Sequence, residues 1–350
     1  MSELIDIKSL FPKELEALMT DLGQPKYRAQ QIFKWLHRGV HTFDEMSDLP
    51  KSLRSILLQN CYISTALIEK KLKSRYDSTV KYLFRLRDDE FIEAVLMEYH
   101  HGWSMCISSQ VGCKMGCTFC ATGRSGFVRS LTASEMLSQI TEAQLDNGIR
   151  ISNIVLMGMG EPLDNFDNVL RFLELLSDEN GICIGQRHVS VSTCGLVDRI
   201  NELAKMKPQF TLSVSLHAPN DKIRSATMPV NNRWGVSELL TACRSYAETT
   251  GRRVSYEYAL IGGVNDSDEC ALELAARLKG SLCHVNLIPV NSVEGTGCRT
   301  PDKKRIAAFQ KVLTDKGITA TVRRTLGSDI NASCGQLRRR AAEENKGNAE

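Results

Sequence analysis

Hydrophobic residues recur at intervals of three and four positions through the first sixty residues, a spacing that predicts helices. The expected helices cover residues 12–23, 24–39 and 50–60. Gly23 and Gly39 stand where the first two patterns stop, as is common just after a helix C-terminus. We therefore expect a small helical domain. Its scattered Lys and Arg form either a solvated face or a docking surface for an acidic partner such as RNA.

The hydrophobic period shortens to two within residues 61–100. Two β-rich runs, residues 78–89 and 90–99, flank a turn beginning at Asp88 and predict a β-hairpin. A basic run at residues 70–75 precedes them, and we interpret it as a solvated face. This part of the chain is expected to be a hairpin linker.

From about residue 104 onward, β-like segments alternate with helical ones. The predicted strands lie at residues 104–109, 153–158, 188–193, 211–216, 254–261, 283–290 and 320–325. Repeated βα winding predicts an α/β fold with a parallel sheet, and seven strands fall short of the eight that close a barrel. In such partial barrels the chemistry lies at the carboxyl ends of the strands.

The composition excludes several classes of protein. The chain has 350 residues, of which 42% are hydrophobic and 24% charged, so collagen, wholesale disorder and a small disulfide scaffold are ruled out. No apolar run approaches the ~18–20 residues that a membrane span needs. The net charge of +3 argues neither for nor against nucleic acid. Twelve cysteines without a visible signal peptide favour the reducing cytoplasm.

Three of these cysteines form the most specific candidate site, Cys113-Lys-Met-Gly-Cys117-Thr-Phe-Cys120, directly after the first predicted barrel strand. Three thiolates this close in the chain suit either zinc or an iron–sulfur cluster. Structural zinc usually takes four ligands, and a [4Fe–4S] cluster usually takes four cysteines. A set of three at the active end of a sheet leaves one iron open for a substrate or cofactor, which favours the cluster.

This spacing after the first strand of a partial barrel resembles the radical S-adenosylmethionine (SAM) superfamily, whose open iron is chelated by SAM. Phe119 matches the aromatic residue usual before the last cysteine. The resemblance implies a [4Fe–4S] cluster on Cys113, Cys117 and Cys120, and SAM as the second cofactor. It also implies SAM contacts at the ends of later strands, where the glycines of the Met157–Pro162 run let a backbone approach a ligand closely. The expected contacts are Gly160, Glu161, Ser192, Ser215, Leu216, His217 and Asn291.

A closer resemblance is to the RlmN/Cfr family of radical SAM methyltransferases of RNA adenine, over roughly residues 10–340. It rests on the runs WSMCISSQVGCKMGCTFCATG (103–123), MGMGEPLDN (157–165), VSTCG (191–195), SLHAPN (215–220), RSATMPVN (224–231), GGVND (262–266), HVNLIPVN (284–291) and DINASCGQLR (329–338). The Gly-Glu-Pro form of the second run resembles the C2 enzymes more than the C8 resistance enzymes. Cfr-type C8 methylation is the alternative.

The family resemblance implies methylation of C2 of adenine in 23S rRNA, near the peptidyl transferase centre, and in tRNA, 3′ of the anticodon, with two SAM per turnover. Cys334 matches the cysteine that carries the methyl group. Cys106 matches the cysteine that forms a transient disulfide with it and releases the product, and Glu93 matches the base that removes the C2 proton.

Taken without the resemblance, these three residues indicate much less. Cys106 lies in a β-strand pattern and fits a core hydrophobe. Glu93 alternates with Ile92 and Ala94, which by itself predicts a solvent-facing strand residue. Cys334 stands in a loop beside a glycine and fits an inert thiol.

The expected partners are 23S rRNA, tRNA and an electron donor of the flavodoxin or ferredoxin type, with no membrane, and the protein is expected to be a monomer. Arginines suited to phosphates and splayed bases occur near the motifs. They are Arg124, Arg129, Arg323, Arg324 and Arg338–Arg340.

The predicted organisation is a helical RNA-docking domain (1–60), a hairpin linker (61–100), a partial radical SAM barrel of the (βα)6 type (101–340) and a polar tail (341–350). Two other classes remain open from the sequence. One is a radical SAM enzyme with a substrate other than RNA, and the other is a zinc-bearing RNA-binding module without catalysis.

Overall fold

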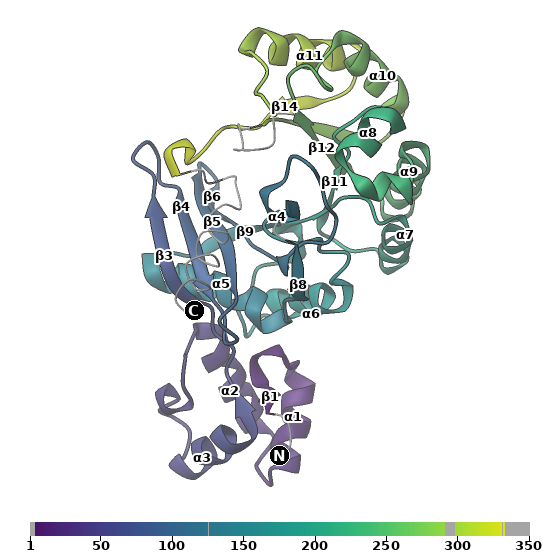
Figure 1. Ribbon diagram of the computed structural model, residues 1–350. Helices are drawn as coiled ribbons and strands as arrows, with labels where there is room; N and C mark the ends of the chain where they lie inside the picture. Colours follow the sequence, from purple (N-terminus) through teal and green to yellow (C-terminus); the bar gives the residue numbers. More distant parts are fainter. Residues whose placement is uncertain (1–3, 125, 291–297, 331, 333–350) are drawn as a thin grey trace.

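The computed structural model describes residues 4–124, 126–290, 298–330 and 332. Its centre is one ten-stranded sheet with the strand order β14-β13-β12-β11-β10-β9-β6-β5-β4-β3 (Figure 1). Seven neighbouring strands of this sheet run parallel to one another. They are β6 (Gly102–Cys106), β9 (Ile151–Leu156), β10 (Val189–Thr193), β11 (Thr211–Ser215), β12 (Val254–Leu260), β13 (Cys283–Pro289) and β14 (Ala320–Val322).

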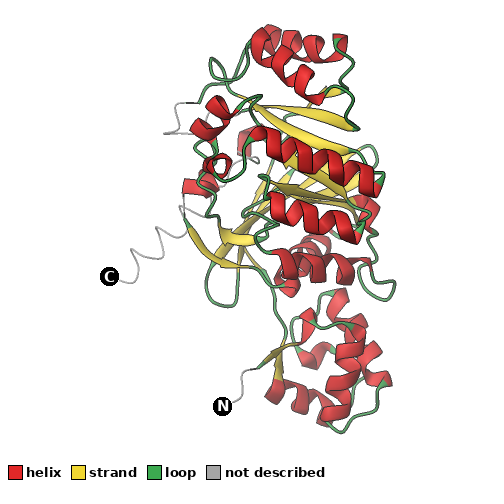
Figure 2. Cartoon of the chain, turned by 90° about the vertical axis from the view of Figure 1, so that its right-hand side faces the viewer, coloured by secondary structure: helices red, strands yellow, loops and turns green. Residues whose placement is uncertain are grey.

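Helices connect successive parallel strands and cover one face of the sheet (Figure 2). They are α5 (Ala133–Asn147), α6 (Phe166–Ser177), α7 (Val197–Met206), α9 (Val236–Thr250), α10 (Asp268–Leu278) and α11 (Lys303–Asp315). Helix α5 shows why these segments start and stop where they do. The Thr132 hydroxyl accepts the Glu135 N–H at its N-terminus, and Gly148 ends it in the left-handed conformation. The predicted partial α/β barrel is confirmed.

The predicted hairpin is also confirmed, and it extends the barrel sheet. Strand β5 (Phe91–Tyr99) pairs antiparallel with β6 on one side and with β4 (Val80–Arg85) on the other. A further strand, β3 (Leu67–Lys73), forms the exposed edge. The basic run at residues 70–75 therefore falls largely in an edge strand. Lysines on an edge discourage pairing with other chains.

The three predicted amino-terminal helices are present as a lobe below the sheet in Figure 1. They are α1 (Pro12–Asp21), α2 (Tyr27–Arg38) and α3 (Lys51–Asn60). The two ends of this lobe meet in a short parallel pair of strands, β1 (Ile5–Asp6) and β2 (Cys61–Tyr62). Two-residue strands leave no periodic signal, so the sequence pattern did not predict them.

Buried polar side chains join the amino-terminal lobe to the barrel. The Lys8 ammonium is buried and donates to the hydroxyls of Ser138 and Thr141 on α5, at 3.0 and 3.2 Å. Glu14 of α1 accepts two hydrogen bonds from the Arg171 guanidinium of α6. The lobe is thus fixed to two barrel helices by specific donors and acceptors as well as by apolar contact.

Candidate active site

A cavity of about 390 Å³ opens at the carboxyl ends of the parallel strands. Most of the residues proposed from the sequence line it, although they are far apart in the chain. They are Glu93, Cys106, Cys113, Cys117, Cys120, Gly160, Glu161, Ser192, Ser215 and His217. Leu216 is fully buried and does not line the cavity. Asn291 and Cys334 lie outside the described residues.

The three motif cysteines stand on a loop whose ends are joined by two short strands that the sequence pattern did not reveal. Strand β7 (Gln110–Gly112) pairs antiparallel with β8 (Phe127–Ser130), and the Cys113 N–H donates to the Gly126 carbonyl at 2.9 Å. Gly112 has φ +80°, and a Cβ there would lie 1.9 Å from the Gly126 oxygen. Only glycine permits this closure, which makes the cysteine loop a closed unit.

The chemistry of the cysteine loop fits a bound metal group. Burial raises the pKa of the Cys113 and Cys117 thiols to about 12, so each needs the positive charge of a metal to ionise at neutral pH. Within the described ranges, no three His, Cys, Asp or Glu side chains are grouped to hold one metal ion. The ligands of a cluster each bind a different iron, so they need not converge on one point.

Glu161 presents a carboxylate at the cavity wall, where the Met157–Pro162 run turns away from β9. Its oxygens accept the backbone N–H groups of Leu163 and Cys194, at 3.0 and 2.7 Å. Burial raises the pKa of Glu161, and these hydrogen bonds partly oppose the shift. A second polar group, such as an ammonium, would favour the ionised form of this carboxylate.

The glycines of this run have a different role from the one expected from the sequence. A Cβ at Gly158 would lie 2.6 Å from the Ile107 carbonyl, and one at Gly160 would lie 2.6 Å from the Gln110 Cβ. The space beside both glycines is therefore filled by the chain itself, between β6 and β7. They allow two loops to pack together, which places Glu161.

His217 connects the ends of β11 and β12 to the cysteine loop. It has φ +54°, and its Nδ1 accepts the Ala259 N–H at 2.9 Å, so the proton of the neutral ring is on Nε2. Burial, helped by the positive charge of Arg224, lowers the pKa of His217 to about 3. The ring also meets Phe119 edge-on, with centroids 5.0 Å apart. His217 is thus a neutral donor that also supports the loop between Cys117 and Cys120.

Glu257 of β12 lines the same cavity, and the sequence analysis missed it. It is buried, and its carboxylate accepts hydrogen bonds from Ser255 and Asn286, at 3.1 and 2.7 Å. Burial raises its pKa. An acidic residue in the middle of an otherwise buried strand run was the available signal for it.

Glu93 and Cys106 come together at the hairpin side of the cavity. The Glu93 carboxylate pairs with the Lys81 ammonium at 2.7 Å, and both side chains are almost fully buried. Burial raises the pKa of the Cys106 thiol, while the positive charges of Arg323 and Lys81 oppose that shift. Ala332, two residues before Cys334 in the sequence, packs against the small apolar cluster that contains Cys106.

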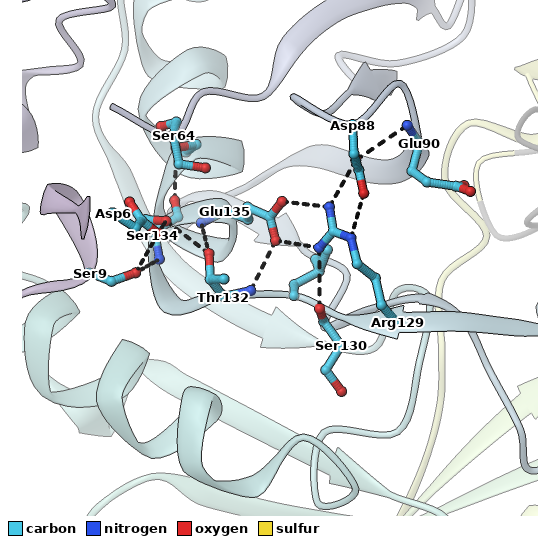
Figure 3. Close-up of polar contacts among 12 residues, drawn as sticks. Asp6, Ser9, Ser64, Asp88, Glu90, Arg129, Ser130, Thr132, Ser134 and Glu135 are labelled. Atoms are coloured by element: carbon cyan, nitrogen blue, oxygen red, sulfur yellow. Dashed lines mark hydrogen bonds and ion pairs between the residues drawn. The ribbon is translucent and has the colours of Figure 1, made fainter. Parts of the chain in front are cut away.

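The arginines differ sharply in their availability for RNA. Arg129 of β8 uses all its donors inside the protein, toward Asp88, Glu135 and the Ser130 carbonyl (Figure 3). Arg129 therefore has no N–H group left over for a phosphate, in contrast to what its position beside the cysteine loop suggested from the sequence.

The other arginines proposed from the sequence are placed differently. Arg323 and Arg324 line the cavity, and Arg124 is exposed. Arg338–Arg340 lie outside the described residues. The cavity therefore has cationic groups of its own at the last strand of the sheet.

Figure 3 also shows that the Arg129 network reaches the amino-terminal lobe. Glu135 accepts the Thr132 N–H, the Thr132 and Ser134 hydroxyls share a hydrogen bond, and Ser134 in turn donates to Asp6. A continuous set of hydrogen bonds thus runs from the cysteine loop to the lobe.

Among the described residues, no helix has the length and apolar character required to cross a membrane.

Known proteins resemble this chain over both its barrel and its amino-terminal lobe. Residues 107–275 match the model of the radical SAM superfamily, which defines the class of the barrel and its cysteine loop. Residues 5–63 match the model of the ribosomal RNA large subunit methyltransferase N-terminal domain. The chain also resembles a solved radical SAM methyltransferase from Sphaerobacter thermophilus. The TM-score is 0.91 and the sequence identity 44%, over 95% of this chain and 99% of that one.

Relatives of nearly the same length narrow the class further. A protein of Alkaliphilus oremlandii, named as a probable dual-specificity RNA methyltransferase RlmN, is 55% identical over 97% of this chain and 98% of its own length. One of Clostridium tetani with the same name is 48% identical over 99% of both chains. The chain therefore belongs to the RlmN family of radical SAM RNA methyltransferases. Enzymes of this class use a [4Fe–4S] cluster and SAM, and the cysteine loop fits that cluster.

Proposed function

We propose that this enzyme methylates C2 of adenine in 23S rRNA and in tRNA, through a methylated Cys334. The observation that carries the proposal is the single cavity at which Glu93, Cys106 and the cysteine loop meet. The names of its relatives support RNA as the substrate and support two kinds of RNA. Adenine C2 lies between two ring nitrogens and is electron-poor, so it does not displace a methyl group from SAM directly.

When bound, the cluster and SAM supply the radical that activates the methyl group. In this proposal Cys334 first accepts that group as a thiolate, which is a good sulfur nucleophile. The carbon of the methyl group on Cys334, after losing one hydrogen atom to that radical, would then form a bond to C2 of adenine. The resulting protein–RNA adduct would give one electron back to the bound, oxidised cluster, and Glu93 would take the C2 proton. Finally, the Cys106 thiolate attacks the Cys334 sulfur and breaks its bond to the methylene carbon. The electron pair of that bond leaves with the carbon, which takes a proton and becomes the methyl group of the released adenine. Reduction of the resulting Cys106–Cys334 disulfide resets the enzyme.

The SAM subsite is proposed at the rim formed by the ends of β9, β10 and β11. Glu161 suits the ammonium of the methionine part, because a carboxylate accepts charge-assisted hydrogen bonds. Ser192, Ser215 and the neutral Nε2–H of His217 suit its polar edges. Gly160 and the backbone at Leu216 support this rim, and Asn291 completes the proposed set.

The test uses purified, anaerobically reconstituted enzyme with SAM and transcripts of 23S rRNA and tRNA. Mass spectrometry of the digested RNA against both isomers is expected to give 2-methyladenosine, whereas 8-methyladenosine would establish the C8 alternative. Failure of both RNAs to accept a methyl group would overturn the proposal.

Two cysteine variants test the covalent scheme. Cys334→Ala is expected to abolish methylation, because the methyl carrier is lost. Cys106→Ala is expected to trap a protein–RNA crosslink that migrates as a shifted band on a denaturing gel. The matched control is Cys270→Ala, a buried cysteine on α10 that does not line the cavity and should turn over normally. Normal turnover by Cys106→Ala would contradict the two-cysteine scheme.

A further inference from the structure

The run Arg224–Asn231 (RSATMPVN) has no role in the chemistry proposed above, yet its first residue is unusual. It forms α8 (Asp221–Thr227) and the following 3-10 turn η4 (Pro229–Asn232). Arg224 is 0% exposed and is among the largest fully buried side chains of the described protein. A buried arginine calls for an account of its charge and of its donors.

The donors of Arg224 are satisfied by neutral oxygens. Its Nε donates to the Leu216 carbonyl at 3.1 Å, and Nη1 donates to the Asn231 side-chain oxygen at 3.1 Å. Its Nη2 donates to the carbonyls of Cys194 and Ser215, at 2.5 and 3.2 Å. These bonds tie the ends of β10 and β11 together behind the cavity wall.

The positive charge of Arg224, unlike its hydrogen-bond donors, has no direct partner of opposite charge among the described residues. Over the ranges that the structure describes, no carboxylate lies within ion-pair distance of this guanidinium. Asp221 is on the same helix, but its carboxylate accepts hydrogen bonds from Asn231 and from the Val236 N–H. Removing a cation from water without an anion is costly, so a buried arginine normally has a negative partner.

Besides Asp221, the groups whose charge acts on Arg224 are the thiols of Cys194, Cys117 and Cys243. Burial raises the pKa of Cys117 to about 12 and raises that of Cys194 well above its ordinary value. The positive charge of Arg224 lowers both, which places the guanidinium within electrostatic reach of a cysteine that is a proposed cluster ligand. A bound cluster converts that thiol to a thiolate and so brings negative charge to this point.

The cysteine loop rests directly on the helix that carries Arg224. The Thr118 N–H donates to the Thr227 carbonyl at 3.0 Å, one turn of α8 after Arg224. Pro229 of the following turn η4 lies beside Gly116, since its side chain would be 3.6 Å from a Cβ added there. Both contacts come from the loop between Cys113 and Cys120. The arginine and the loop are therefore held in a fixed relation by the same short helix.

We propose that Arg224 is the buried counter-charge of the iron–sulfur cluster and raises its reduction potential. The thiolate ligands make the assembly negative, and reduction adds one more electron to it. A fixed cation beside the site favours the more negative, reduced form, so the cluster accepts an electron more readily. Arg224 is a positioning residue, since it reaches the site through backbone oxygens and its field. The inference rests on the family's cluster and not on the RNA substrate or on C2 selectivity.

The test is an anaerobic redox titration of the holoprotein with dithionite and mediators, with the reduced cluster followed by electron paramagnetic resonance. Arg224→Gln removes the charge and is expected to shift the midpoint potential to more negative values at unchanged iron and sulfide content. Arg224→Lys keeps the charge but loses several hydrogen bonds, and its potential is expected to stay near that of the wild type. Asn231→Ala is the matched control, because it removes one hydrogen bond to Arg224 and no charge.

Each outcome decides the matter. An unchanged potential in Arg224→Gln would overturn the proposal. A midpoint potential of Arg224→Lys well below that of the wild type would also overturn it. This second outcome can be measured even if Arg224→Gln fails to fold. Equal loss of cluster from both variants would show that the hydrogen bonds matter rather than the charge, which also overturns it. Loss from the Gln variant alone would support it. RNA methylation, assayed separately, tests the proposed function independently.

Discussion

At the scale of single residues, the environment of Glu93 depends on a cation from the neighbouring strand. Lys81 of β4 lies 2.7 Å from it, and the two side chains are 1% and 6% exposed. Such a pair costs free energy to desolvate, so it is weak evidence of stabilisation. Because the pair lies beside Cys106 in the proposed active site, we interpret it as a device that holds the Glu93 carboxylate at a fixed position.

Breaking this pair from one side should destabilise the protein more than replacing both partners. Lys81→Met removes the ammonium that pairs with this buried carboxylate, and the expected loss in free energy of unfolding is ~3–5 kcal/mol. The double variant Lys81→Met/Glu93→Gln removes both charges and should recover much of that loss. Urea unfolding of the anaerobic protein, followed by circular dichroism, measures the cycle. Additive effects of the two changes would contradict the coupling.

The same residue shows what local pattern can and cannot predict. Alternation with Ile92 and Ala94 indicated a solvent-facing position for Glu93, and that prediction was wrong. Both faces of β5 are covered: Ile92, Ala94 and Leu96 pack into the main core, and Val95 and Met97 pack into the small cluster that contains Cys106. Period-two alternation reports two faces of a strand, but it does not report what packs on each of them.

At the scale of elements, the cysteine loop depends on the closure made by β7 and β8. Gly112→Ala would force a Cβ against the Gly126 carbonyl oxygen. Because that oxygen belongs to the backbone, it cannot move aside as a flexible side chain could. We expect the strand pair to open and the iron content of the anaerobically purified protein to fall several-fold. Iron and sulfide analysis, with a far-ultraviolet dichroism spectrum to confirm the fold, measures this.

Gly126→Ala is the matched control for that variant. Gly126 also has a positive φ, of +73°, but nothing lies within 4 Å of an added Cβ. Only the conformational strain of about 1–2 kcal/mol should apply, with the cluster retained. Equal iron loss from both variants would mean that backbone strain, and not the close approach of the two strands, controls the loop.

Elements of ordinary length followed from the sequence, and very short ones did not. The helices of the amino-terminal lobe and the seven parallel strands show clear periodicity over five or more residues in most cases. The pairs β1–β2 and β7–β8 span two to four residues, and they are fixed by contacts between distant segments. The role of Gly158 and Gly160 likewise depends on Ile107 and Gln110, against which they pack. No local pattern in the sequence relates these residues to one another.

At the scale of the whole molecule, the amino-terminal lobe and the barrel share one polar interface. Asp6 and Lys8 enter it from the lobe, and α5 supplies the hydroxyls of Ser134, Ser138 and Thr141. The hydrogen bonds through Glu135 and Arg129 then continue to the base of the cysteine loop (Figure 3). The amino-terminal lobe and the cysteine loop are therefore both anchored to the N-terminus of α5.

Lys8 makes this interface sensitive to pH in a direction that can be worked out. Burial lowers the pKa of Lys8 from 10.5 to about 8, so between these values the unfolded chain holds a proton that the folded chain has released. Unfolding then takes up a proton, and it becomes less favourable as the pH rises. We expect the stability of the wild type relative to Lys8→Met to grow by about 1.4 kcal/mol per pH unit above pH 8. Urea unfolding at pH 7 and pH 9.5 measures the difference, with Lys13→Met on the exposed side of α1 as the control for loss of one lysine. A difference that does not change with pH would contradict the lowered pKa of Lys8 and its burial as a charged group at this interface.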